Sequence, residues 1–240
     1  MKNKKAFGFT LAEVLITLGI IGVVAALTIP QVVKNYKEKA TVTHLKKAYS
    51  VMAQAWQMAT LKYGEWKDWG LNPGDEDILV DRITPFFKAT RVCHTTTDMS
   101  ECMPDAMYLS SVGTDYFSWV NVANNLHNRT ALVLNNGVVL MMNILNENAR
   151  KLQFYVDLNG KDKPNKLGDD FFYFYVAKDG QIYPAGHIKT LEETEDKDEF
   201  FKQNCLNARG FSCANWVLEN ENLDYFKCKD LSYNSKRKCK

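Results

Sequence analysis

The chain has 240 residues, of which 46% are hydrophobic, and it carries 30 lysines and arginines against 28 aspartates and glutamates. A net charge of +2 argues against a dedicated nucleic-acid binder, which usually has a clustered basic face. No Ser/His/Asp set, phosphate-binding loop or metalloprotease helix can be read from the sequence, so we expect no enzyme.

The first apolar segment covers residues 9–29 and contains one charged side chain, Glu13. At about 1.5 Å per residue a helix of this length spans about 30 Å, which predicts a single membrane crossing. Lys2, Lys4 and Lys5 precede the segment, so the N-terminus is predicted to stay cytoplasmic and the rest to be exported. A carboxylate at the centre of such a helix costs about 2.5–3.5 kcal/mol, and less near its end, so Glu13 needs an explanation.

Two ordinary interpretations leave Glu13 without a role. A secretory signal peptide has a shorter apolar core, although Val24-Ala25-Ala26 could serve as its cleavage site. A plain membrane anchor explains the length of the segment but not its acid.

A third interpretation comes from the run Gly8-Phe9-Thr10-Leu11-Ala12-Glu13. It resembles the cleavage and methylation motif of type IV pilins and type II secretion pseudopilins. The resemblance implies that a prepilin peptidase cuts after Gly8 and methylates Phe9, that Glu13 serves assembly, and that Pro30 kinks the helix at the end of its apolar half. Cleavage creates an ammonium on Phe9, and this charge and the Glu13 carboxylate each need a partner, in the same or a neighbouring subunit.

The family resemblance implies a structural subunit, a pseudopilin or minor pilin. Its partners would be the prepilin peptidase, other pilin or pseudopilin subunits, an inner-membrane assembly platform and the membrane, with nucleic acid only in a DNA-uptake role. It would lie in the bacterial inner membrane with a periplasmic or extracellular head, and then in a filament. The alternative is a single-pass anchored binding protein or enzyme that does not polymerise.

The amphipathic half of the long helix is expected over residues 30–63, after a leader at 1–8 and a membrane half at 9–29. Apolar residues recur there in steps of three and four, which predicts one face that a globular domain covers. They are Val42, Leu45, Tyr49, Met52, Trp56, Ala59 and Tyr63.

An exported head is expected over residues 64–240, with a short helix at about 77–88 before an antiparallel sheet. Asn136-Gly137 lies between two apolar runs, a strong hairpin signal in which both turn positions accept positive φ. "KLQFYVDL", "DFFYFYVA" and "QIYP" predict three further strands, with Asp179-Gly180 turning the last pair. The prediction is therefore an α+β, pilin-like fold in which the long helix packs on an antiparallel sheet.

All six cysteines follow the apolar segment, as expected for a domain exported to an oxidising compartment. They lie in three close pairs, which favours local disulfides, although the sequence alone permits about 15 pairings. The pairs are Cys93 with Cys102, Cys205 with Cys213, and Cys228 with Cys239.

Residues 155–186 are similar to a loop and hairpin common in pseudopilin-like proteins, some of which bind calcium in this region. Asp157, Asn159, Asp169 and Asp170 offer oxygen ligands, but their spacing does not fit an EF-hand. No cofactor is otherwise expected. The alternative for this segment is an Asx-rich turn satisfied by its own backbone.

Overall fold

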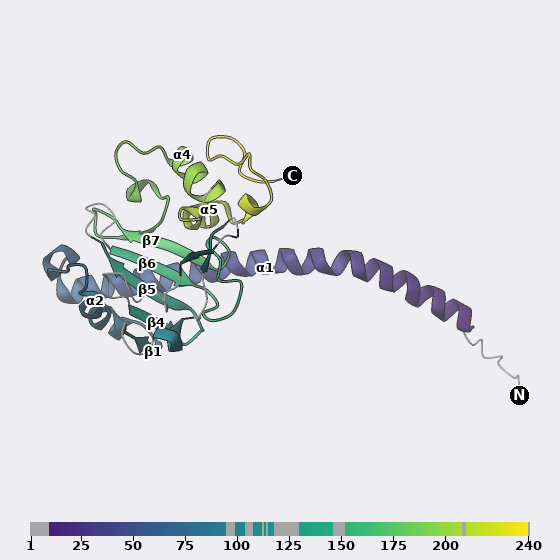
Figure 1. Ribbon diagram of the computed structural model, residues 1–240, viewed down its shortest axis with the longest axis horizontal. Coiled ribbons are helices and arrows are strands. Elements are labelled where there is room, and N and C mark those ends of the chain that lie inside the picture. The colour runs from purple at the N-terminus through teal and green to yellow at the C-terminus, as the bar shows by residue number, and fades with distance from the viewer. Residues whose placement is uncertain are drawn as a thin grey trace, which may run out of the picture. The chain divides into compact units, whose positions relative to one another are not determined.

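The computed structural model describes residues 10–94, 99–103, 108–111, 113, 115–117, 130–145, 152–207 and 210–239. The chain divides into two compact units, Met1–Ala40 and Thr41–Lys240. Helix α1 (Leu11–Tyr63) runs through the boundary between them (Figure 1).

The first unit consists of the N-terminal part of α1, in which no residue from 11 to 40 is buried. Pro30 lies inside this helix, which continues on both sides of it. The proline ring has no N–H, so the Ala26 carbonyl loses its usual helical donor at this point.

The second unit is built on a six-stranded antiparallel sheet with the order β1-β4-β5-β6-β7-β8. Its long central strands lie side by side in Figure 1. The strands are β1 (Ala89–Cys93), β4 (Thr130–Leu134), β5 (Val139–Ile144), β6 (Leu152–Asp157), β7 (Phe171–Val176) and β8 (Ile182–Pro184). A separate pair is formed by β2 (Tyr108–Leu109) and β3 (Asp115–Phe117).

One face of the sheet packs against the second half of α1, which confirms the predicted α+β architecture. The Tyr49 ring stacks on Phe174 with centroids 5.4 Å apart, and Trp56 meets Phe154 edge-on at 5.6 Å. The Trp56 indole N–H also donates to the Gly180 carbonyl oxygen at 2.7 Å. The covered helix face is broader than the predicted stripe, because small alanines let the helix approach the sheet. Its buried residues are Val42, Leu45, Ala48, Met52, Ala55, Trp56 and Ala59.

Two members of the predicted stripe lie at its margin: Tyr49 is only partly buried, and Tyr63 is 38% exposed. Tyr63 is the last residue of α1, where the helix leaves the sheet.

The opposite face of the sheet is covered as well, so every residue of β7 is buried. Phe172 and Phe174 belong to the core beside α1, whereas Phe171, Tyr173 and Tyr175 belong to a second core. Other members of that second core include Met99, Met103, Tyr108, Leu167 and Ala185.

The predicted helix at about 77–88 is too long. Helix α2 covers Glu76–Ile83, a 3-10 turn follows at Thr84–Phe86, and β1 begins at Ala89. Pro85 stops the α-helix because it supplies no N–H for the next hydrogen bond.

The turn between β4 and β5 differs from the prediction that both Asn136 and Gly137 take a positive φ. Gly137 has φ +84°, whereas Asn136 does not take a positive φ. The Gly137 N–H donates to the Leu134 carbonyl oxygen at 3.0 Å, and the Leu134 N–H donates to that of Val138. This is the three-residue loop in which only the last position requires glycine. Gly180 occupies the same place in the turn before β8.

The C-terminal segment is packed rather than extended. It contains α4 (Lys197–Phe201), a π-helical turn (Lys202–Leu206), α5 (Cys213–Asn220) and a 3-10 turn (Asp224–Phe226). The Asp198 carboxylate accepts hydrogen bonds from the Ser232 hydroxyl at 2.9 Å and the Tyr233 N–H at 2.6 Å. The Phe201 ring stacks on Trp216 with centroids 4.2 Å apart, and Tyr233 meets Phe201 edge-on at 5.3 Å.

The remaining short helical elements lie in the connections after α1, β8 and β1. They are the 3-10 turns Trp66–Trp69 and Ile188–Thr190, and α3 (Met99–Cys102).

Candidate functional site

The acid at the start of α1 caps the helix that contains it. The Glu13 carboxylate accepts hydrogen bonds from the Thr10 N–H at 2.8 Å and from the Thr10 hydroxyl at 2.7 Å. The Glu13 N–H in turn donates to the Thr10 hydroxyl oxygen at 3.2 Å. Thr-x-x-Glu is therefore a capping box, in which N-cap and N3 side chains satisfy N–H groups at the helix start. A capping role for Glu13 was not predicted from the sequence, although the Thr10-Leu11-Ala12-Glu13 spacing signals it.

The other polar side chains of the apolar segment are satisfied within the helix. Thr17 donates to the Val14 carbonyl oxygen, and Thr28 donates to that of Val24, each at 2.9 Å. Hydrocarbon offers no alternative partners, so such internal bonds suit a helix in a bilayer.

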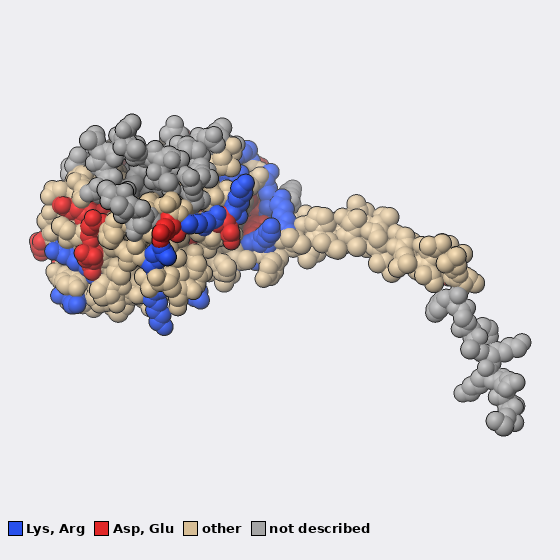
Figure 2. Space-filling view, turned by 60° about the horizontal axis from the view of Figure 1, so that its bottom comes forward, with Lys and Arg blue, Asp and Glu red and all other residues tan. Residues whose placement is uncertain are grey.

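The apolar half of α1 presents its side chains outward around the whole helix. It is long and apolar enough to cross a membrane, and none of its most apolar window is buried. Figure 2 shows it as a continuous surface without basic or acidic side chains in that view. The exposed large residues include Leu15, Ile16, Leu18, Ile20, Ile21, Val23, Val24 and Leu27. A surface of this kind needs a membrane or other protein chains around it.

The predicted processing residues Gly8 and Phe9 lie outside the described residues.

The six cysteines form three local disulfides, and each joins two cysteines close in sequence. Cys93 bonds Cys102, at a sequence separation of 9. Cys205 bonds Cys213, at a separation of 8, and Cys228 bonds Cys239, at 11. The first fastens α3 to β1, and the other two fasten the C-terminal segment.

The oxygen-rich loop after β6 is organised around two buried carboxylates. Asp157 accepts hydrogen bonds from the Gly160 N–H at 2.8 Å and the Asn159 N–H at 3.1 Å. Asp170 accepts from the Asn165 N–H at 2.8 Å and the Lys166 N–H at 2.6 Å. These bonds fit the Asx-turn alternative, because every carboxylate oxygen already has a donor once the Tyr108 hydroxyl is counted on Asp157.

Calcium binding by this loop stays a prediction. Asp169 and Asn159 are partly exposed, whereas Asp157 and Asp170 are buried. Within the described part of the chain, no group of three or more His, Cys, Asp or Glu side chains is placed to hold a metal ion.

Burial gives the two loop carboxyls raised pKa values. Desolvation raises the pKa of Asp157 to about 8, with a further contribution from the negative charge of Asp170. Desolvation also raises the pKa of Asp170 to about 6, against the lowering effect of its backbone hydrogen bonds. Such shifts occur in functional sites and in structural networks alike, and here the partners are backbone groups of the same loop and the Tyr108 hydroxyl.

A third buried carboxyl, Glu76, was not anticipated from the sequence. It is fully buried at the start of α2 and accepts hydrogen bonds from the backbone N–H groups of Ile144 and Gly74, each at 3.0 Å. Burial raises its pKa. Glu76 ties α2 to the end of β5, so its role is structural.

Comparison with known families defines the class of the N-terminal segment. A model described as the prokaryotic N-terminal methylation motif matches residues 3–29. This match supports the type IV pilin-like motif and implies processing by a prepilin peptidase and assembly with other pilin subunits.

A second model, described as a family of unknown function (DUF6613), matches residues 31–201. The match covers more than half of the chain, which therefore belongs to this family. Comparisons with curated proteins and with solved structures gave no significant match.

Proposed function

We propose that this protein is a pseudopilin or minor pilin, a structural subunit of a type IV pilus-like or type II secretion filament. The observation that carries the proposal is the methylation motif at residues 3–29. This motif includes the first part of α1, and none of the most apolar window of that helix is buried. In the proposed precursor this surface lies in the inner membrane, with Lys2, Lys4 and Lys5 on the cytoplasmic side. In the filament, neighbouring helices would replace the lipid.

The structure of the head supports a helix whose first part serves the filament and whose second part belongs to the head. Its own core covers residues 42–59 of α1, whereas residues 11–41 of the helix contribute no buried residue to that core. The first part of the helix is thus available for intermolecular packing without unfolding the head. Three disulfides fit a head that faces an oxidising compartment.

The proposed processing is tested by intact-mass measurement of the full chain co-expressed with a prepilin peptidase. The wild-type protein should begin at Phe9 and carry one added methyl group. Gly8→Val should keep the leader, because the proposed cut needs a small residue on its leader side. Gly19→Val is the matched control: a Cβ at Gly19 meets nothing within 4 Å, so cleavage should be unaffected. An uncleaved wild-type protein would favour the non-polymerising anchored protein instead.

Assembly is tested separately by chemical cross-linking of the cleaved protein in a strain that contains the filament machinery. Incorporation should give ladders of cross-linked subunits. A cleaved protein that stays monomeric in the membrane would contradict the filament role but not the processing.

A further inference from the structure

A groove with a volume of about 360 Å³ lies beside α1, within the second unit. Lys47, Val51 and Met58 reach it from one flank of α1, because residues separated by one or two helical turns lie on the same side of a helix. The other side of the groove is formed by Phe86 and Lys88, which precede β1, and by the turn between β4 and β5.

The base of the groove is apolar. Leu134 is buried in the core beside α1, and Val51 and Phe86 pack against that core while staying partly exposed. Met58 is 43% exposed, and Leu61, one turn further along the helix, is exposed as well. Large apolar side chains that remain accessible around a hollow are typical of a surface that another molecule covers.

Two exposed lysines, Lys47 and Lys88, border this apolar base, and the described lining of the groove contains no acid. In the part of the chain that the structure describes, neither ammonium is paired with a carboxylate, whereas the neighbouring Lys46 pairs with Glu221. The groove therefore fits a partner that combines an apolar side chain with negative charge.

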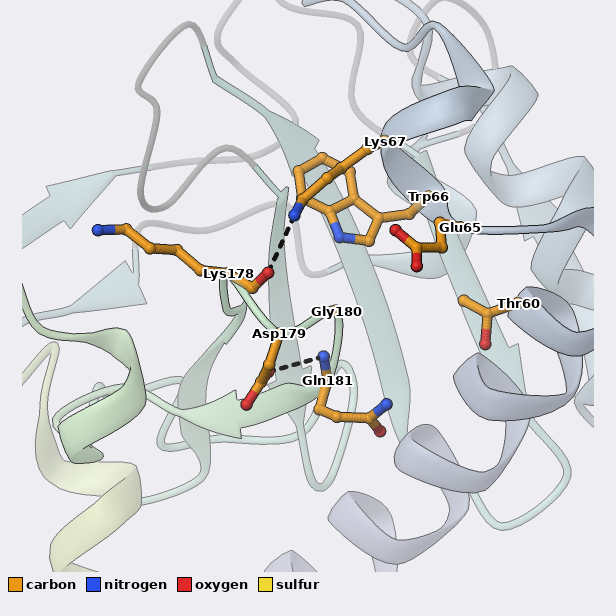
Figure 3. Close-up of a pocket in the computed structure, with 8 residues that line it drawn as sticks. All are labelled: Thr60, Glu65, Trp66, Lys67, Lys178, Asp179, Gly180 and Gln181. Carbon is orange, nitrogen blue, oxygen red and sulfur yellow. Dashed lines mark hydrogen bonds between the residues drawn. The ribbon is translucent and has the colours of Figure 1, made fainter.

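A second cavity, at the end of α1, is lined by charges of both signs (Figure 3). Its acids are Glu65 and Asp179, and its lysines are Lys67 and Lys178. The Lys67 ammonium donates to the Lys178 carbonyl oxygen at 3.0 Å, so part of this lining is already engaged within the chain. The basic groove selects a partner by its charge more strongly than this cavity does.

The segment after β8, residues 188–196, has the properties that the groove requires, and we call it the acidic segment. Its last six residues contain four acids and no base. The Glu195 carboxylate accepts the Glu192 N–H at 2.8 Å, which holds the backbone in a turn. The side chains of Glu192 and Glu193 are exposed and pair with no cation among the described residues. Ile188, at the start of the segment, is 59% exposed.

The groove and the acidic segment lie at opposite edges of the sheet. The strand order places β1 at one edge and β8 at the other, and Figure 1 shows β1 and α4 on opposite sides of the central strands. The acidic segment leads from β8 to α4. A second copy that fills the groove therefore leaves its own groove free for a third. Such a head-to-tail contact can repeat along an open chain, which is the symmetry of a filament.

We propose that the groove beside α1 binds the acidic segment of a second copy of this chain. Ile188 covers the apolar base of the groove, and the carboxylates of Glu192 and Glu193 pair with the two groove lysines. The inference rests on the proposed filament role, which brings copies of the head side by side. It names the surfaces through which neighbouring heads meet.

Carbodiimide cross-linking of the full chain tests this contact, because the reagent joins a lysine to a carboxylate only where the two groups touch. The chain is expressed in a strain that contains the filament machinery, and cross-linked dimers from its membranes and sheared filaments are mapped by peptide mass spectrometry. The wild type should give links between the peptides of Lys47 or Lys88 and the peptide of Glu192 and Glu193.

Co-expression of two variants shows whether the link joins different copies. One variant carries Lys47→Gln and Lys88→Gln, and the other carries Glu192→Gln and Glu193→Gln. Neither variant can form the link within itself, so each should give none when expressed alone. The mixture should give the link at reduced yield, because only some neighbours pair an intact groove with an intact acidic segment.

The apolar half of the contact has its own variants. Ile188→Asp should lower the yield of the link about tenfold or more, because it brings a charge onto an apolar surface, and Met58→Asp should do the same from the groove side. Ile78→Asp is the matched control: Ile78 is exposed on α2 outside the groove lining, so this variant should link as wild type. Near-ultraviolet circular dichroism checks that each variant is folded, and the co-expressed pair decides the question if an aspartate variant is not.

Three results would overturn the inference: no link in the wild type, no link in the co-expressed pair, or yields from Ile188→Asp and Met58→Asp that equal that of Ile78→Asp. Links from the groove lysines to another protein would assign the groove to a different subunit and overturn it as well. Links between copies that never enter the sheared filaments would support this contact and contradict the filament role. A chain that enters filaments without the link would do the reverse.

Discussion

The Tyr108 hydroxyl donates a hydrogen bond of 2.6 Å to the Asp157 carboxylate, and both residues are fully buried. This bond joins the small β2–β3 sheet to the end of β6, beneath the loop that Asp157 and Asp170 organise. Burial raises the pKa of the Tyr108 phenol, so the phenol stays protonated and remains the donor.

The buried loop carboxyls predict a stability that falls as the pH rises. In the folded state the pKa of Asp157 is raised to about 8 and that of Asp170 to about 6, above the usual value of about 3.9 for an unfolded chain. The folded protein therefore holds these protons more tightly. Their contribution to the free energy of unfolding is full below pH ~4 and is lost as the pH rises through about 6 and 8.

Asp157→Asn should flatten this dependence, because the amide stays neutral and can still accept from the Asn159 and Gly160 N–H groups. Between pH 5 and 8 the wild type should lose more stability than the variant, by at least about 1.4 kcal/mol, the equivalent of one pKa unit. Urea melts at both pH values measure this. Asp162→Asn, at an exposed site in the same loop, should behave as wild type. Parallel pH curves for wild type and Asp157→Asn would contradict the prediction.

Glu13→Val should be inserted and cleaved but should fail to enter filaments. An apolar residue is tolerated in the bilayer, whereas the Phe9 ammonium loses a partner for its charge, a loss of up to about 3–5 kcal/mol where the pair is fully buried. Sheared filament fractions and cross-linked ladders measure incorporation.

Thr10→Val separates the two roles of Glu13, because it removes the hydroxyl half of the capping box and leaves the acid. We expect Thr10→Val to assemble better than Glu13→Val. Equal defects would show that capping of the helix explains the acid, and wild-type incorporation of Glu13→Val would remove the assembly role altogether.

Peptide mapping without reduction should recover the three local disulfides and no free thiol. Replacing Cys228 and Cys239 by serine should lower the free energy of unfolding by about 2–3 kcal/mol, the chain-entropy value for a loop of this size. Linkage of Cys93 or Cys102 to a C-terminal cysteine would contradict the local pairing.

Trp56→Ala should destabilise the head by about 3–5 kcal/mol, since it leaves a large cavity and an unpaired Gly180 carbonyl between helix and sheet. Met58→Ala, two residues away and 43% exposed in the wild type, should cost much less. Chemical melts of the two variants give the comparison. Similar losses would show that helix and sheet are not joined through Trp56.

Calcium binding by the loop is decided by thermal melting of the full chain with calcium and with chelator. A ligand that binds only the folded state raises the melting temperature. The calcium prediction requires such a rise in the wild type and its loss in Asp169→Asn. An unchanged melting temperature would leave the loop as a turn held by its own backbone.

The sequence by itself determined the features that depend on local order. The leader lysines, the cut-site residues and Glu13 identify the N-terminal motif because they act within one short segment. The period of the apolar residues determined which helix face is covered, and the two turn glycines placed the hairpins. The cysteine spacing favoured local pairs, and the structure has those pairs.

The tertiary structure alone decided what covers the second face of the sheet and where the acids lie. The aromatic run of β7 indicated two buried faces, but Tyr108 and Met99 reach one of them from distant parts of the chain. Glu76 and Asp157 look like surface residues in the sequence, because burial depends on contacts with β5 and Tyr108 that no local pattern contains. The unpartnered Trp66 N–H is likewise defined only by the fold, since Trp56 and Trp69, close by in sequence, both find carbonyl partners.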